Sequence, residues 1–129
     1  SDFSRINLTD TEDEILNKIK KAKTDIHPIP GDKSKLNGRP EAENLLGIYS
    51  SINNQTIEDS LNEFEGKNFS EFKNKLSEIL VEKISPISLE IKKLLSDTNH
   101  LDQILLEGAS KAEEIAGNKI KEIKKILGF

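Results

Sequence analysis

The sequence of 129 residues contains no cysteine, no methionine and no tryptophan, and few other aromatic residues. Without cysteine the chain has no disulfide framework, no thiolate metal site and no cysteine nucleophile. His27 and His100 lie far apart, and neither has another histidine three or four residues away, so no metal ligands are predicted. Because methionine is absent even from position 1, we expect a cleaved or excised fragment, with Ser1 either native or left from a tag.

The sequence also lacks a long hydrophobic run and a signal peptide, so a cytoplasmic protein with no membrane partner is expected. Glycine-rich phosphate loops and the HExxH, GxSxG and EF-hand patterns are absent as well. The many carboxylates fall on predicted solvent faces beside lysines. We therefore do not predict catalysis by this chain alone.

The charge balance bears on binding to polyanions. The net charge is −4, from 19 basic and 23 acidic residues, and the acidic excess lies before residue 67. Nucleic-acid binders usually carry an excess of lysine and arginine, so any contact with a polyanion must be local and is favoured in the second half.

Hydrophobic periodicity predicts an all-α fold, a helical bundle of about five helices with a long irregular surface loop near 24–39. The expected helices span about 12–23, 40–53, a short stretch after Thr56, one long helix from 69 or 70 through Pro86, and about 99–127. Thr11 begins a capping box, and the prolines at 28 and 30 prevent a helix in the loop. All five apolar faces, including that of 99–127, are expected to share one core.

Basic side chains near helix ends can be read in two ways. The lysines near the C-terminus suit the helix dipole and are most simply a solvated helix end. Lys73 lies near a helix start, where the dipole disfavours cations, so its position is more suggestive of binding. These patterns alone indicate only a helical bundle.

Five strings, in this order, point to a family. They are KKAKTD at 20–25, GRPEAENLLGIYS at 38–50, FEGKNFSEFK at 64–73, ISPI at 84–87 and LLEGA at 105–109. Together they resemble the C-terminal, anticodon-binding part of bacterial tryptophanyl-tRNA synthetases, which are class I aminoacyl-tRNA synthetases. The resemblance covers essentially the whole chain.

The resemblance implies a parent that attaches tryptophan to tRNA(Trp) through a tryptophanyl-adenylate, using ATP and magnesium. A Rossmann-type catalytic domain would precede this chain, and the fragment itself would be inactive and hold no cofactor. Ser1 resembles the last serine of the KMSKS motif, so residues 1–10 would be the tail of that loop and a linker. Residues 11–129 would form the anticodon-binding domain. The parent is expected to be a homodimer and the fragment a monomer.

The resemblance also implies residues that contact tRNA. Lys73 matches a lysine that contacts the anticodon region, and Asp25 occupies the region of a second contact, where a carboxylate can accept a proton from a base amino group. Phe3, Ile6 and Leu8 are expected to contact the catalytic domain and to be exposed or disordered without it.

Two alternatives stay open. A helical protein-interaction module without RNA binding would explain the same periodicity. The related tyrosyl enzyme normally continues into an S4-type RNA-binding domain, and the absence of one after residue 129 favours the tryptophan enzyme.

Overall fold

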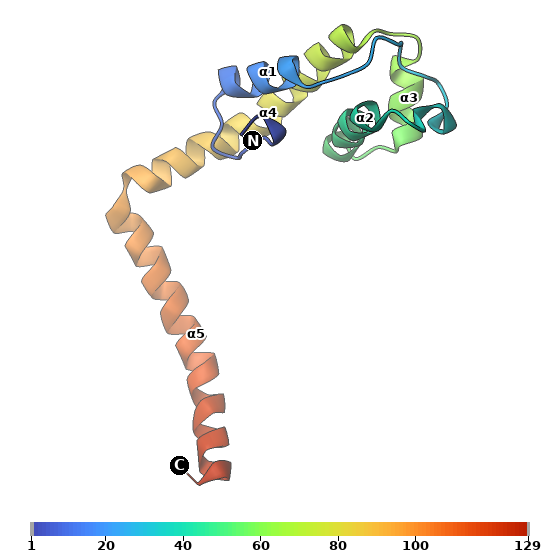
Figure 1. The fold of residues 1–129 in the computed structure, drawn as a ribbon. Helices are drawn as coiled ribbons and strands as arrows, with labels where there is room; N and C mark the ends of the chain where they lie inside the picture. Colours follow the sequence, from blue (N-terminus) through green and yellow to red (C-terminus); the bar gives the residue numbers. More distant parts are fainter. Residues whose placement is uncertain (1, 129) are drawn as a thin grey trace. The chain divides into compact units, whose positions relative to one another are not determined.

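A computed structural model describes residues 2–128, and in that range all the regular structure is helical (Figure 1). Five α-helices and two short 3-10 helices follow one another along the chain. The chain divides into two compact units between Leu89 and Glu90. The predicted all-α class with five helices is confirmed.

Local capping signals set the starts of two helices. Helix α1 (Glu12–Lys21) begins after Thr11, whose backbone N–H donates to Glu14 Oε2 at 2.7 Å while its Oγ accepts from Glu14 N at 3.3 Å. Helix α3 (Ile57–Phe64) begins after Thr56 in the same way, with Asp59 as the reciprocal partner. Each capping box satisfies two backbone donors that would otherwise lack a helical acceptor.

The other helices also follow the predicted boundaries closely. Helix α2 (Pro40–Asn53) has proline in its first turn and ends at Asn54, which adopts a left-handed conformation with φ of 54°. Helix α4 (Phe69–Ser96) continues across Pro86 as one helix, as predicted. Helix α5 (Thr98–Leu127) follows Asp97, whose side chain accepts from the backbone N–H of His100.

The hydrophobic core belongs to the first unit and is built from α1, α2, α3, the first part of α4 and the connecting loop. Its centre is formed by the rings of Tyr49, Phe64, Phe69 and Phe72. Phe64 is edge-on to both Tyr49 and Phe72, at centroid distances of 5.0 Å. Aliphatic side chains surround the rings. The buried hydrophobic residues are Ile15, Ile19, Ile29, Leu36, Ala42, Leu45, Leu46, Tyr49, Leu61, Phe64, Phe69, Phe72, Leu76, Ile79 and Leu80.

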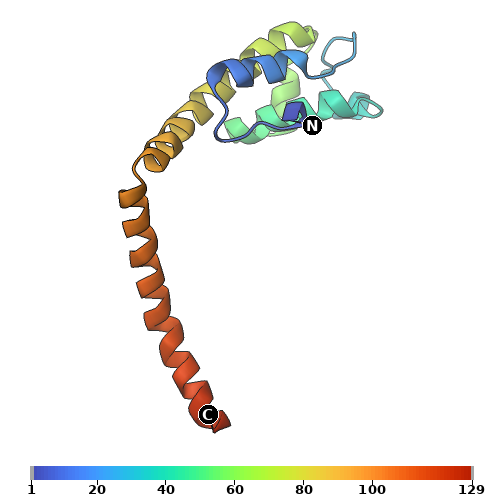
Figure 2. The same cartoon turned by 60° about the vertical axis from the view of Figure 1, so that its left-hand side comes forward.

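The loop between α1 and α2, whose path can be followed in Figure 2, corrects one expectation, because two of its side chains belong to the core. It contains the 3-10 helix η2 (Lys33–Leu36), and it buries Ile29 and Leu36 almost completely. Ile29 also exchanges two backbone hydrogen bonds with the turn before α4, donating to Lys67 O and accepting from Gly66 N, both at 2.9 Å. The two prolines exclude a helix there, but they do not keep the loop out of the core.

The segment before α1 is partly packed on the first unit. It begins with the 3-10 helix η1 (Asp2–Ser4), and Asp10 is buried, where it accepts a 2.7 Å hydrogen bond from Lys18 Nζ. Phe3 and Leu8 are each 54% exposed, as expected, but Ile6 is half-buried against the core. The expectation of exposure is therefore wrong for Ile6.

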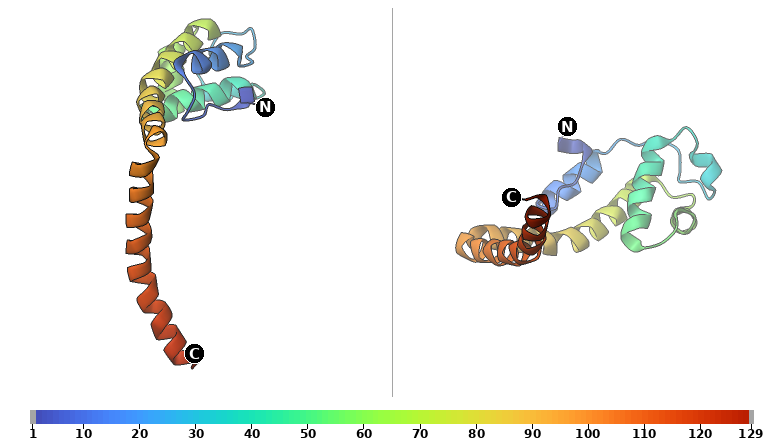
Figure 3. Two further views of the ribbon diagram at one scale, coloured as in Figure 1. Left: turned by 90° about the vertical axis from the view of Figure 1, so that its left-hand side faces the viewer. Right: turned by 90° about the horizontal axis from the view of Figure 1, so that it is seen from below.

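Helix α5 was expected to bury its apolar face in the shared core, and it does not. Figure 3 shows it as one continuous helix, and none of its described residues is buried. Its apolar stripe, predicted to join the shared core, is exposed instead; Leu105 is 61% and Ile115 75% exposed. Periodicity shows that a helix has an apolar face, but not what covers that face. No helix in the part described here is both long and apolar enough to cross a membrane.

Candidate functional site

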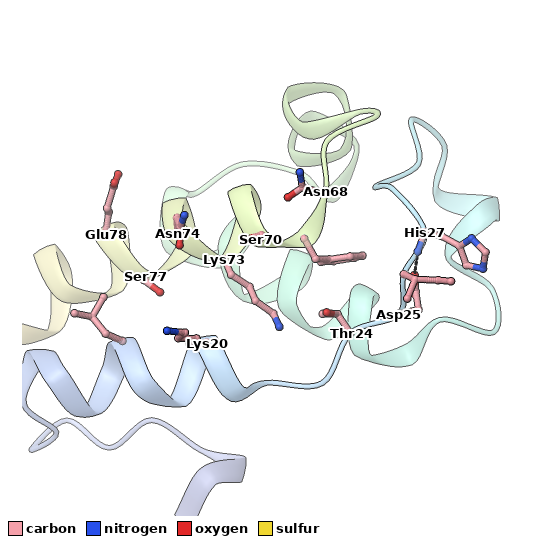
Figure 4. A pocket seen from close by; sticks show the side chains of 13 residues that line it. Lys20, Thr24, Asp25, His27, Asn68, Ser70, Lys73, Asn74, Ser77 and Glu78 are labelled. Carbon is pink, nitrogen blue, oxygen red and sulfur yellow. Dashed lines mark hydrogen bonds between the residues drawn. The ribbon is translucent and has the colours of Figure 1, made fainter.

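An open pocket of about 870 Å³ lies in the first unit, between α1 and the first turns of α4 (Figure 4). Its walls come from the second half of α1, the loop that follows, and the start of α4. The lining residues are Leu16, Lys20, Thr24, Asp25, Ile26, His27, Asn68, Phe69, Ser70, Lys73, Asn74, Ser77 and Glu78. The fold thus places both predicted tRNA-contacting residues, Lys73 and Asp25, in one pocket although they are far apart in sequence.

Lys73 is a half-buried cation in the wall of this pocket. Its ammonium group donates a hydrogen bond to the carbonyl of Ala22, the residue that caps the C-terminus of α1. Burial lowers the pKa of Lys73 from its usual value. Within residues 2–128, no carboxylate lies within 4.0 Å of its Nζ. An ammonium has three donors, so Lys73 keeps two for a ligand.

The start of α4 offers less to an anion than its dipole suggests. The side chain of Asn68 accepts a 2.9 Å hydrogen bond from the backbone N–H of Glu71, which caps the helix from within the chain. Lys73, and the exposed Lys20 on the facing helix, are therefore the groups in the pocket that can attract a phosphate.

Asp25 is held by Arg39, a residue that the sequence reasoning did not single out. Arg39 Nε donates to Asp25 Oδ2 and Nη2 donates to Oδ1, both at 2.8 Å. Asp25 Oδ1 also accepts from the backbone N–H of His27 at 2.9 Å. The hydrogen bonds from Arg39 hold the pKa of Asp25 below its usual value, against the opposing effect of burial, so the group is a carboxylate at neutral pH.

No sequence rule pairs residue 25 with residue 39. Arg39 belongs to the GRPEAENLLGIYS string. Its side chain contacts Asp25 because the loop between them folds back on itself. The remaining prediction, Ser1, lies outside the described residues. Within those residues, there is no group of three or more histidine, aspartate or glutamate side chains that could hold a metal ion.

No protein-family model matches the chain. The whole chain does align with curated bacterial proteins named tryptophan–tRNA ligase. It is 47% identical to the Agrobacterium fabrum protein over 129 residues, which are 36% of that protein. It is 45% identical to the Caulobacter vibrioides protein and 42% identical to the Rickettsia typhi protein, and it covers 38% of each.

The matches cover the whole chain, and they fall in the C-terminal part of the relatives. By sequence the chain is thus similar over its whole length to a segment of enzymes of the aminoacyl-tRNA synthetase class. Within that class it matches the C-terminal part of bacterial tryptophan–tRNA ligases, and the predicted resemblance is confirmed. The chain spans little more than a third of the length of the relatives it matches.

Proposed function

We propose that this chain is the part of a tryptophan–tRNA ligase that binds the anticodon arm of tRNA(Trp). In this proposal residues 11–129 form the anticodon-binding domain, and residues 1–10 link it to a KMSKS-type loop that Ser1 would end. The catalytic domain, tryptophan, ATP and magnesium belong to the rest of a homodimeric cytoplasmic enzyme. In this proposal the chain alone is inactive in that reaction.

The observation that supports the proposal most directly is that Lys73 is half-buried in the pocket wall without a nearby carboxylate among residues 2–128. A cation that is half-buried and has no carboxylate within 4.0 Å in the described range has lost part of its hydration without gaining a counter-ion. A phosphate group would supply that missing counter-ion. The hydrogen bond to Ala22 fixes the lysine at the pocket wall, so a ligand would meet a pre-oriented donor.

The other pocket groups suit a nucleotide. Asp25 is a carboxylate that can accept from a base amino group, and Thr24, Asn68, Ser70 and Asn74 bring further donors and acceptors. Ile26 at the rim is 95% exposed and offers an apolar contact to an unstacked base. Recognition of single-stranded anticodon bases needs few residues, so it is compatible with an acidic chain.

The test is a filter-binding titration of tRNA(Trp) at several salt concentrations, comparing Lys73→Gln with the natural chain. Loss of a phosphate contact is expected to weaken binding about tenfold and to reduce the slope of log K against log salt by about one. Lys83→Gln is the matched control, because Lys83 is an exposed lysine of the same helix that pairs with Glu82. A slope that stays the same in Lys73→Gln would contradict the phosphate contact.

A second function is favoured by one specific observation, the exposed apolar stripe of α5. Such a stripe is typical of a helix face that contacts protein. If the chain shows no affinity for tRNA even at low salt, the protein-interaction module becomes the better proposal.

A further inference from the structure

The guanidinium of Arg39 makes four hydrogen bonds with its five N–H donors, and one face lies near an aromatic ring. In addition to the two bonds to Asp25, Nη1 donates to Pro28 O and Nη2 donates to His27 O, both at 3.2 Å. The guanidinium carbon also lies 5.7 Å from the centroid of the Phe69 ring. The side chain is only 16% exposed, so Arg39 is part of the pocket's support and is not a free cation available to phosphate.

These contacts determine what the carboxylate of Asp25 can do. Among the residues that the structure describes, Oδ1 accepts from both Arg39 and His27, whereas Oδ2 accepts only from Arg39. Each carboxylate oxygen can accept about two hydrogen bonds, so Oδ2 keeps one acceptor position. The side chain of Asp25 is 32% exposed, so a ligand can reach the carboxylate group. An unsupported aspartate on a loop would present four acceptor positions in many orientations.

We infer that Arg39 is a positioning residue for base recognition: it holds Asp25 so that one oxygen lone pair is offered to a base amino group. The inference rests on the proposed tRNA-binding function and extends it to specificity. The planar fork of arginine is needed because lysine cannot make two parallel bonds to one carboxylate. Arg39→Lys should therefore keep the charge and lose the alignment.

The experiment measures the affinity of the full chain for a tRNA(Trp) transcript and for transcripts with one changed anticodon base. Arg39→Lys is expected to reduce the preference for the cognate transcript about tenfold at the base that Asp25 contacts, with no change in salt slope. In the background of Asp25→Asn, Arg39→Lys should cause no further loss, because both act through one carboxylate. Arg5→Lys, the same change at an exposed arginine, should leave the preference unchanged.

Three outcomes would overturn the inference: an unchanged preference in Arg39→Lys, losses that add in the double variant, or a salt slope reduced by one. Hydrogen exchange of the His27 amide in the free chain supplies a readout without RNA, and it should become faster in Arg39→Lys. If the natural chain shows no preference among the transcripts, the proposed function fails. Amide exchange then still decides whether Arg39 orders the loop.

Discussion

Tyr49 shows how burial and one neighbour change the chemistry of a single side chain. It is 3% exposed, it packs against Phe64 and Phe72, and its hydroxyl donates to Glu63 at 2.8 Å. Burial, and then the hydrogen bond and charge of Glu63, raise its pKa to about 12 because all three disfavour a phenolate. Helical periodicity places Tyr49 on the apolar face of α2, but it does not identify Glu63 as the partner of the hydroxyl.

Because Tyr49 is the only tyrosine and tryptophan is absent, its ionisation can be followed by ultraviolet absorbance. The folded chain is expected to titrate near pH 12 and the denatured chain near 10. Glu63→Gln should lower the folded midpoint partway, since burial remains. The unfolded state loses its proton first, so stability should fall as pH rises from 10 towards 12. A folded midpoint near 10 would contradict the buried hydrogen bond.

At the scale of the helices, the sequence determines starts and ends through short local patterns. Thr11 and Thr56 each act within three residues, and Asn54 ends α2 by its own backbone conformation. These interactions need no tertiary partner, so they could be predicted. The loop 24–39 has no such local determinant for Ile29 and Leu36, which are held by long-range packing and by backbone bonds to the turn at Gly66 and Lys67.

The cap of α3 can be tested by substitution. Thr56→Ala removes the side-chain oxygen that accepts from Asp59 N, and is expected to lower the free energy of unfolding by about 1 kcal/mol. Thr56→Ser keeps that oxygen and should lose much less. Urea unfolding followed by circular dichroism measures both. Equal stability of the alanine variant and the natural chain would show that this cap contributes nothing.

At the scale of the whole molecule, a helix with an apolar face is not always a buried helix. The first unit holds the whole buried hydrophobic core, whereas α5 has an equally regular apolar stripe and buries none of its described residues. The same Ile and Leu periodicity therefore contributes buried hydrophobic contacts in the first unit but not in α5. The core helices are held by tertiary packing, and α5 relies on its length, its Asp97 cap and helix propensity.

This difference predicts unequal effects of the same substitution. Leu76 is fully buried, so Leu76→Ala should lower the free energy of unfolding by about 2–5 kcal/mol. Leu105 is 61% exposed, so Leu105→Ala should change it by less than about 0.5 kcal/mol. Chemical denaturation of both variants decides. A large loss in Leu105→Ala would mean that its face is covered in solution.

The sequence by itself determined the all-α class, the helix boundaries and the family, because capping boxes, periodicity and ordered strings are local properties of the chain. Only the tertiary structure decided which apolar faces are buried, that Lys73 and Asp25 share a pocket, and that Arg39 holds Asp25. Those features join residues that are distant in sequence, and their contacts depend on how the loop 24–39 packs on the core and on the turn before α4. Periodicity carries no information on that packing.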